Sequence, residues 1–162
     1  MHTKNMKKIP KILLAVILLA CTNDKGIIET VNSESCLPDT EFNVSGITNQ
    51  STREFVMDLK GKPKSTKYDE DLRLETLIYA DMTLEISNNY VLYLSTESRE
   101  NSTPNGIRPG LSKSGVFEIL GLKISDGKRK EYQILNCNTE SYMVLRFNEE
   151  KLTYLGMGID LP

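Results

Sequence analysis

The sequence contains few of the residues that enzymes and metal sites most often use. Its 162 residues include no tryptophan, and the only histidine is His2, close to the N-terminus. A serine–histidine–aspartate triad, an imidazole general base and a histidine-rich zinc site are therefore excluded from the rest of the chain. The sequence has no C-x-x-C pair and no G-x-S-x-G motif, and its glycines are too few for a phosphate-binding loop. We expect a protein that is not an enzyme and holds no cofactor.

Two charged stretches raise the question of an ion-binding site. Asp69, Glu70 and Asp71 are consecutive, but the D-x-D-x-D-G calcium loop with its distal glutamate is absent, so we interpret them as a solvated turn. Arg108 lies shortly before a predicted helix, where it either contacts an anion at the helix N-terminus or belongs to the turn that starts the helix. We keep Arg108 as a candidate binding residue and expect no metal site.

The first twenty residues have the pattern of an export signal. Four lysines precede an apolar run from Ile12 to Ala20, which is too short to cross a bilayer. The segment from Leu18 to Cys21 (LLAC) resembles the bacterial lipobox, at which a signal peptidase cleaves before a lipid-modified cysteine; the alternative is a plain secretory signal with a chance cysteine. The resemblance implies that residues 1–20 are a lipoprotein signal peptide and that acyl chains such as palmitate on Cys21 anchor the protein to a membrane. Because Thr22 is not the aspartate that often marks inner-membrane retention, we expect a bacterial envelope protein in the outer membrane, facing the periplasm.

Removal of that leader makes the protein acidic. The remaining 142 residues carry 16 basic and 22 acidic side chains, a net charge of −6. The densest basic stretches, Lys60–Lys67 and Lys123–Lys130, contain glycine, proline, serine or aspartate and are interpreted as solvated turns. Because a nucleic-acid-binding protein needs a clustered basic face, we expect no nucleic-acid partner.

Two cysteines remain besides Cys21, at Cys36 and Cys137. Two thiols in an exported, oxidising compartment most often pair, so we predict a structural disulfide between them. The alternative is a catalytic or redox-active cysteine, but the sequence offers neither a C-x-x-C motif nor a histidine to activate a thiolate.

Beyond the leader, the chain divides into a tether and a folded domain. Residues 21–40 are polar and show no sustained periodicity, which is typical of a flexible tether. In the rest of the chain, similar residues recur 60 or 61 positions apart, as with Gly46 and Gly106, Val56 and Val116, Gly61 and Gly121, and Tyr93 and Tyr154. This self-similarity predicts two tandem repeats, residues 41–98 and 99–162, that form one compact domain.

Each expected repeat combines a short helix with antiparallel strands. Thr52 and Ser112 suit helix N-caps, while Gly61 and Gly121 suit the ends of those helices, the second of which runs from Lys113 to Leu120. Apolar and polar residues then largely alternate, as in strands with one buried face, over residues 72–80, 82–87, 90–95, 131–136, 142–147 and 151–156. We therefore predict an α+β fold of two tandem repeats, each a short helix packed on an antiparallel sheet of three or more strands.

The second helix carries the sequence of a known kind of lipoprotein. Gly110 to Gly121 (GLSKSGVFEILG) resembles the G-M-S-x-x-x-V-x-x-x-L-G helix of the SmpA/OmlA lipoproteins, also called BamE, with Leu111 where methionine is usual. A tandem pair of such units is similar to the fold of β-lactamase inhibitor protein. The resemblance implies the helix-on-sheet fold, and it does not transfer a particular partner.

The sheet face that points away from the helices is the expected binding surface. Strand alternation places Glu85, Tyr142 and Arg146 on that face, with Tyr79 beside them. Tyrosine and arginine are enriched at binding hot spots, although tyrosines also simply cover sheet edges. We hypothesise a non-catalytic scaffold or inhibitor-like module that binds another envelope protein through these residues and Arg108. The alternative is a periplasmic small-ligand carrier or hydrolase with a site between the repeats.

Overall fold

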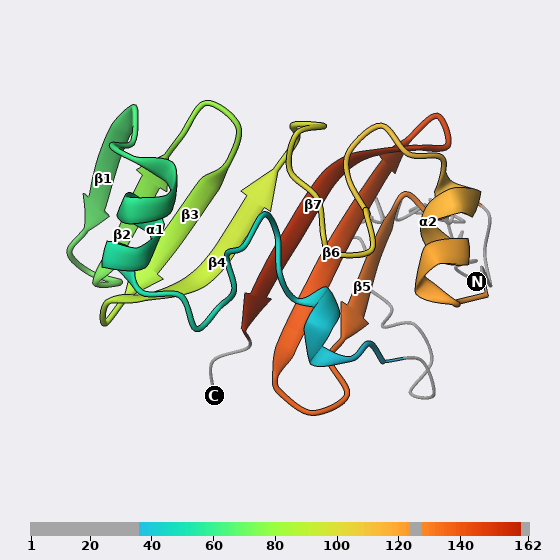
Figure 1. Ribbon diagram of the computed structural model, residues 1–162, viewed down its shortest axis with the longest axis horizontal. Helices are drawn as coiled ribbons and strands as arrows, with labels where there is room; N and C mark the ends of the chain where they lie inside the picture. Colours follow the sequence, from blue (N-terminus) through green and yellow to red (C-terminus); the bar gives the residue numbers. More distant parts are fainter. Residues whose placement is uncertain (1–35, 124–127, 160–162) are drawn as a thin grey trace, which may run out of the picture.

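A computed structural model describes residues 36–123 and 128–159 of the chain (Figure 1). The predicted signal peptide and Cys21 lie outside these residues. The described part contains one 3-10 turn, two helices and seven strands: η1 (Asp39–Glu41), α1 (Arg53–Lys60), β1 (Ser65–Asp69), β2 (Leu74–Ile78), β3 (Thr83–Ser87), β4 (Tyr90–Thr96), α2 (Lys113–Leu120), β5 (Glu131–Leu135), β6 (Ser141–Asn148) and β7 (Lys151–Ile159). Neither of these helices has the length and apolar character needed to span a bilayer.

All seven strands belong to one antiparallel sheet, in the order β1-β2-β3-β4-β7-β6-β5. The predicted α+β fold of two tandem helix-on-sheet repeats is therefore wrong, and the described chain is mostly β. The two expected units are joined because β4 pairs with β7, from Tyr93 opposite Gly158 to Thr96 opposite Leu155. Sequence analysis ended that last strand at Gly156, whereas β7 continues to Ile159 and supplies the residues that close the seam.

The edge of the sheet formed by β1 and β2 also differs from expectation. Part of the basic run Lys60–Lys67, interpreted as a turn, belongs to strand β1, whose five residues are all exposed and therefore show no alternation of apolar and polar residues. The following strand begins at Leu74, not at residue 72, and it buries Leu77. The side chains that face the core are thus Leu77 and Tyr79, one position out of phase with the predicted alternation, which placed Tyr79 on the other face; only 8% of Tyr79 is exposed.

The predicted helix caps are confirmed. The Thr52 hydroxyl oxygen accepts a hydrogen bond from the backbone N–H of Phe55, and Ser112 accepts one from Gly115. Helix α2 ends at Gly121 in the left-handed conformation, with φ of 65°. The strands expected over residues 82–87 and 90–95 are joined by Asn88-Asn89, and both residues have positive φ, as two-residue hairpin turns with right-handed twist require.

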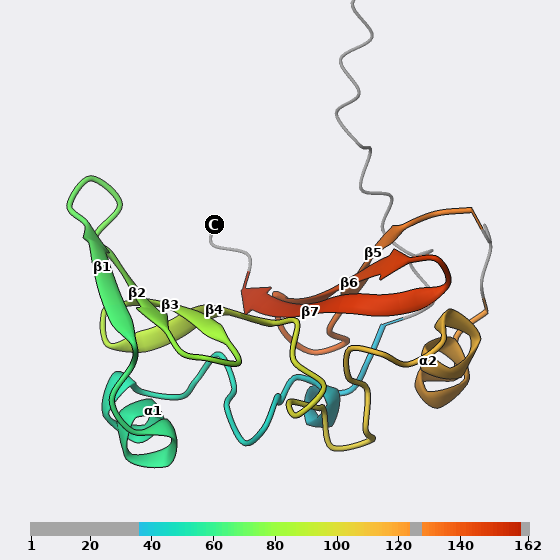
Figure 2. The same cartoon turned by 90° about the horizontal axis from the view of Figure 1, so that it is seen from above.

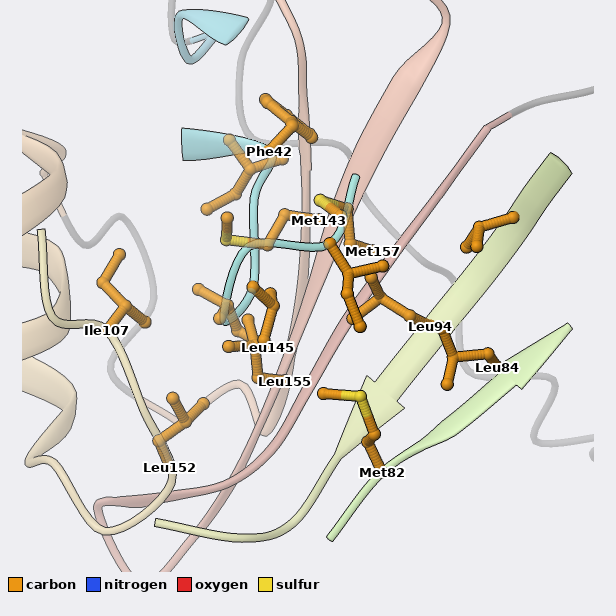
Figure 3. Packing of buried hydrophobic residues seen from close by; sticks show 14 of the residues in the cluster. Phe42, Met82, Leu84, Leu94, Ile107, Met143, Leu145, Leu152, Leu155 and Met157 are labelled. Atoms are coloured by element: carbon orange, nitrogen blue, oxygen red, sulfur yellow. The ribbon is translucent and has the colours of Figure 1, made fainter. Parts of the chain in front are cut away.

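The core lies on one side of the sheet. Figure 2 shows α1 and α2 on the same side, one toward each end of the sheet, with the segments 36–52 and 97–112 between them. Aliphatic side chains of the central strands fill the space beneath these segments, and Ile107 reaches in from the segment before α2 (Figure 3). The buried Glu41 carboxylate accepts hydrogen bonds from Thr103 and Asn105, which joins the two segments.

The described chain is attached to the sheet from its first residue. Cys36 forms the predicted disulfide with Cys137, with their Cα atoms 4.9 Å apart. The next residue, Leu37, is buried, and its N–H donates to the carbonyl of Leu135 at the end of β5. The folded body therefore starts no later than Cys36, although sequence analysis placed the boundary at Glu41.

Candidate binding surface

The second face of the sheet is concave and carries the candidate site. In Figure 2 the sheet rises at both ends on the side away from the helices, and no helix or connecting segment from residues 36–123 or 128–159 covers this face. The strand registers identify the side chains that point this way, which we call the open face; they include Leu74, Thr76, Ile78, Thr83, Glu85, Tyr93, Ser95, Glu131, Gln133, Leu135, Tyr142, Val144, Arg146 and Tyr154.

Two glycines form the floor of the open face at the β4–β7 seam. Gly156 and Gly158 of β7 face the same side as the tyrosines of the neighbouring strands. A Cβ atom at Gly158 would lie 2.6 Å from Cδ2 of Tyr93 and 2.8 Å from the hydroxyl of Tyr142, and one at Gly156 would also clash with the Tyr93 hydroxyl. The glycines are needed because the tyrosine rings from both neighbouring strands lean over the β7 backbone.

Three tyrosines, Tyr93, Tyr142 and Tyr154, converge over this floor and are called the tyrosine cluster below. The hydroxyls of Tyr93 and Tyr154 are 2.7 Å apart and share a hydrogen bond, and the ring centroids of Tyr93 and Tyr142 are 6.3 Å apart. Burial, followed by the hydrogen bond to Tyr154, raises the pKa of Tyr93 far above its usual value. The Tyr93 hydroxyl at the centre of the cluster therefore stays neutral at physiological pH.

Arg146 lies at the edge of the tyrosine cluster. Its guanidinium is 4.3 Å from the centroid of the Tyr154 ring, and its Nε donates to Glu131 at 2.5 Å. That hydrogen bond is the main reason why the pKa of Arg146 is raised, so the group keeps its charge. Half of the Arg146 side chain is exposed, which leaves its solvent-facing part accessible to a partner.

The structure gathers some of the predicted binding residues and separates the others. Glu85, Tyr142 and Arg146 all lie on the open face, with Glu85 opposite Tyr93 in the β3–β4 pair. Tyr79 does not, because it is buried on the helix side and its hydroxyl donates to the carbonyl of Gly61 at the end of α1. Arg108 is exposed in the segment between β4 and α2, which runs along the helix side of the sheet (Figure 2).

Sequence analysis missed four residues of this surface: Tyr93, Tyr154, Gly156 and Gly158. Tyr93 and Tyr154 were matched to each other at a spacing of 61 residues, but neither was assigned to a face. The signal that could have found the floor is the alternation Gly156-Met157-Gly158 at the end of a strand. Glycines two positions apart remove two side chains from the same face and indicate that other groups approach closely there.

A hollow of about 420 Å³ lies beside the tyrosine cluster and is lined in part by Asp81, Thr83, Ser95 and Tyr154. Lys60 donates to the Asp81 carboxylate at 2.6 Å. Burial would raise the pKa of Asp81, but the hydrogen bonds from Lys60 and Asn101 outweigh it, and the pKa is lowered. A carboxylate that stays ionised beside a lysine suits an ion pair and not a general acid.

No family model matches the chain, and no curated protein matches it. Among solved structures, the fold is similar to an extracellular protein containing an SCP domain from Bacillus anthracis, with a TM-score of 0.50 and 11% identity over 82% of this chain and 49% of that one. It is also similar to a cysteine-rich secretory protein from Staphylococcus aureus, with a TM-score of 0.51 and 6% identity over 78% of this chain and 48% of that one. The chain spans about half the length of each, and at these identities the likeness shows a shared fold alone.

These findings overturn the predicted relationship to the SmpA/OmlA lipoproteins and to β-lactamase inhibitor protein. The similar structures carry other descriptions, and the single continuous sheet differs from a pair of helix-on-sheet units. The motif from Gly110 to Gly121 has a local explanation. Ser112 caps α2, Val116 faces the core and Gly121 ends the helix, so ordinary helix-cap chemistry produces the sequence that suggested the family.

Proposed function

We propose that this protein is a lipid-anchored component of the bacterial cell envelope that binds another envelope protein through the open face and catalyses no reaction. The observation that carries the proposal is the tyrosine cluster with Arg146, which lies on a concave and accessible sheet face. Tyrosine and arginine dominate the energetics of many protein interfaces because they bury large areas and still form hydrogen bonds.

The order within the cluster also supports a binding role. A surface whose side chains are held by their neighbours before binding loses little conformational entropy when a partner arrives. The hydrogen bond between Tyr93 and Tyr154 and the contact of Arg146 with both Tyr154 and Glu131 fix these side chains in the free protein. A mainly neutral centre with one arginine favours a partner surface that is apolar with a hydrogen-bond acceptor near its edge.

The proposed location rests on the leader sequence together with the disulfide. The lipobox-like segment before Cys21 supports lipid anchoring, for which the outer membrane is the expected site. A Cys36–Cys137 disulfide is in keeping with an oxidising, exported compartment. Fifteen residue steps separate Cys21 from Cys36, which is enough chain to span at most about 50 Å. The domain can thus meet partners in the membrane or some distance from it.

The test is a crosslinking pull-down of the tagged protein from its native envelope, with bound proteins identified by mass spectrometry. We expect one stoichiometric partner, and we expect its capture to be lost in the double variant Tyr142→Ala/Arg146→Ala. Tyr68→Ala is the matched control, because Tyr68 is 63% exposed and opposes Glu75, which binds α1 on the helix side. A Cys21→Ala variant removes the proposed lipid anchor and keeps the open face, so it shows whether partner capture requires the anchor. Undiminished capture by Tyr142→Ala/Arg146→Ala would overturn the proposal.

A further inference from the structure

A second hollow lies near the end of β7, on the helix side of the sheet and thus on the face opposite to the tyrosine cluster. Its volume is about 390 Å³, within the range of small-molecule sites. Its walls come from four stretches of chain: the region of η1, the residues just before α1, the turn from β5 into β6, and the end of β7. We call it the amide pocket, because three side-chain amides, those of Asn49, Gln50 and Asn136, contribute to its lining.

The polar groups of the amide pocket are almost all uncharged. Besides the amides, the lining includes hydroxyls such as that of Ser141, a single carboxylate from Asp39, and no basic residue. Phe42 and Ile159 add an apolar surface. A pocket without lysine or arginine has nothing to neutralise a phosphate or carboxylate, so its chemistry selects an uncharged ligand with both donors and acceptors.

Hydrogen bonds within the protein orient two of the amides. The amino group of Asn49 donates to the Ser141 hydroxyl, and the carbonyl oxygen of Asn136 accepts from the backbone N–H groups of Asn138 and Thr139 at 2.7 and 3.2 Å. Each amide therefore keeps its other end for a ligand: an acceptor on Asn49 and a donor on Asn136. Within the described chain, the Gln50 side chain forms no hydrogen bond, and it is exposed at the mouth of the pocket.

The disulfide holds the walls of the amide pocket together. Cys137 follows Asn136 directly, and its bond to Cys36 fixes the chain segment that leads into Asp39. The N–H of Cys137 also donates to the carbonyl of Leu37 at 2.9 Å. Two of the four stretches that form the pocket are thus covalently joined, so the site is preformed in the free protein.

We propose that the amide pocket binds an uncharged N-acetylated sugar. An acetamido group offers an N–H, a carbonyl oxygen and a methyl group in one rigid plane. Asn49 provides an acceptor for the N–H, Asn136 provides a donor for the carbonyl oxygen, and Phe42 with Ile159 accommodates the methyl group and the C–H face of the ring. The Gln50 amide, the remaining hydroxyls and the Asp39 carboxylate suit the hydroxyl groups of a sugar ring.

The test uses the purified full chain in detergent, titrated with N,N′,N″-triacetylchitotriose and followed by calorimetry and saturation-transfer NMR. Maltotriose, with the same number of rings and no acetamido group, is the control ligand. We expect binding of the acetylated trimer only, and about fivefold weaker binding for Gln50→Ala, the loss typical of one neutral hydrogen bond. Gln133→Ala removes an amide from the opposite face of the sheet and should leave the affinity unchanged.

Three results would overturn this inference. The first is no binding of the acetylated trimer at millimolar concentration, and the second is equal binding of maltotriose. The third is equal affinity of the Gln50→Ala and Gln133→Ala variants, which would place the sugar elsewhere. Because the Gln50 side chain is exposed and forms no hydrogen bond within the described chain, its truncation leaves the fold intact, and a loss of binding in the Gln50→Ala variant reports on the pocket itself.

Discussion

The two ends of the sheet are built differently, although each carries an eight-residue helix. Helix α1 buries only Val56, and its Phe55 and Leu59 are 47% and 48% exposed. Helix α2 buries Val116, Phe117 and even Lys113. The edge strands follow the same division, since β1 is exposed along its whole length while β5 buries alternate residues.

Different interactions hold the two ends. At the α2 end, Phe117 packs edge-on against Tyr132 with centroids 4.7 Å apart, and the Lys113 ammonium lies 5.1 Å from the centre of the Tyr132 ring. The disulfide reinforces this end. At the α1 end, ion pairs from Arg53 to Glu75 and from Lys60 to Asp81 connect the helix to the sheet. Because burial contributes more than partly exposed ion pairs, we expect α1 and the β1–β2 hairpin to open first in hydrogen exchange.

The largest expected effect comes from removing the covalent link at the α2 end. The disulfide closes a loop between residues 101 positions apart, so the double variant Cys36→Ser/Cys137→Ser should lose about 4 to 5 kcal/mol of unfolding free energy. Urea denaturation followed by circular dichroism measures the loss. Compared with the native protein, hydrogen exchange in this variant should accelerate most in β5 and β6. Faster exchange confined to β1 and β2 would contradict the comparison of the two ends.

The aromatic core of α2 gives the next largest effect. Phe117 is 2% exposed, so Phe117→Ala should destabilise the protein by about 3 to 5 kcal/mol through lost burial and the cavity that remains. Phe55→Ala is the matched substitution in α1 and should change stability by less than about 1 kcal/mol, because nearly half of Phe55 is already in water. Equal losses in thermal or urea unfolding would mean that the two helices are packed equally well.

A smaller effect is expected at the seam that joins the two ends. Gly158→Ala places a methyl group against Tyr93 and Tyr142, which should cost about 1 to 3 kcal/mol and displace the tyrosine cluster. Near-ultraviolet circular dichroism reports the ring movement, and the pull-down should show reduced partner capture. Ser95→Ala, on the same face, is the control and should alter neither signal. A Gly158→Ala protein with unchanged tyrosine signals would show that the rings do not rest on the glycine floor.

Local chemistry was predictable from the sequence, whereas the joining of the sheet was not. Caps, turns and the bounds of α2 follow from a few adjacent residues, and Thr52, Ser112 and Gly121 act as predicted. The disulfide followed from cysteine number and the export signal. The pairing of β4 with β7 depends on residues about 60 positions apart, and no local pattern specifies which strand edges meet.

Only part of the candidate site could be predicted, because only some of its residues lie in strands with a clear local pattern. Tyr142 and Arg146 belong to a strand with regular alternation, so their face could be read from the sequence. Tyr79 was misplaced because the residues around β2 contain apolar side chains on both faces, and a shift of one position reverses every assignment. The glycine floor was not predicted because strand prediction uses the alternation of apolar and polar side chains, and glycine has no side chain.

The smallest expected effect concerns the ion pair at the α1 end. The pKa of Asp81 is lowered in the folded protein, so the carboxylate stabilises the fold at neutral pH. This contribution is lost as the pH falls below about 4, the pKa of an aspartate in the unfolded chain, and through the lower pKa of the folded state. Asp81→Asn should therefore cost about 1 to 2 kcal/mol between pH 6 and 8, and the difference from the native protein should shrink below about pH 4. Urea unfolding at a series of pH values measures it, with the exposed Asp58→Asn as the charge-matched control. A difference that persisted unchanged to pH 2 would mean that the Asp81 side chain acts through its shape and neutral hydrogen bonds, and that the α1 end depends on charge less than its two ion pairs indicate.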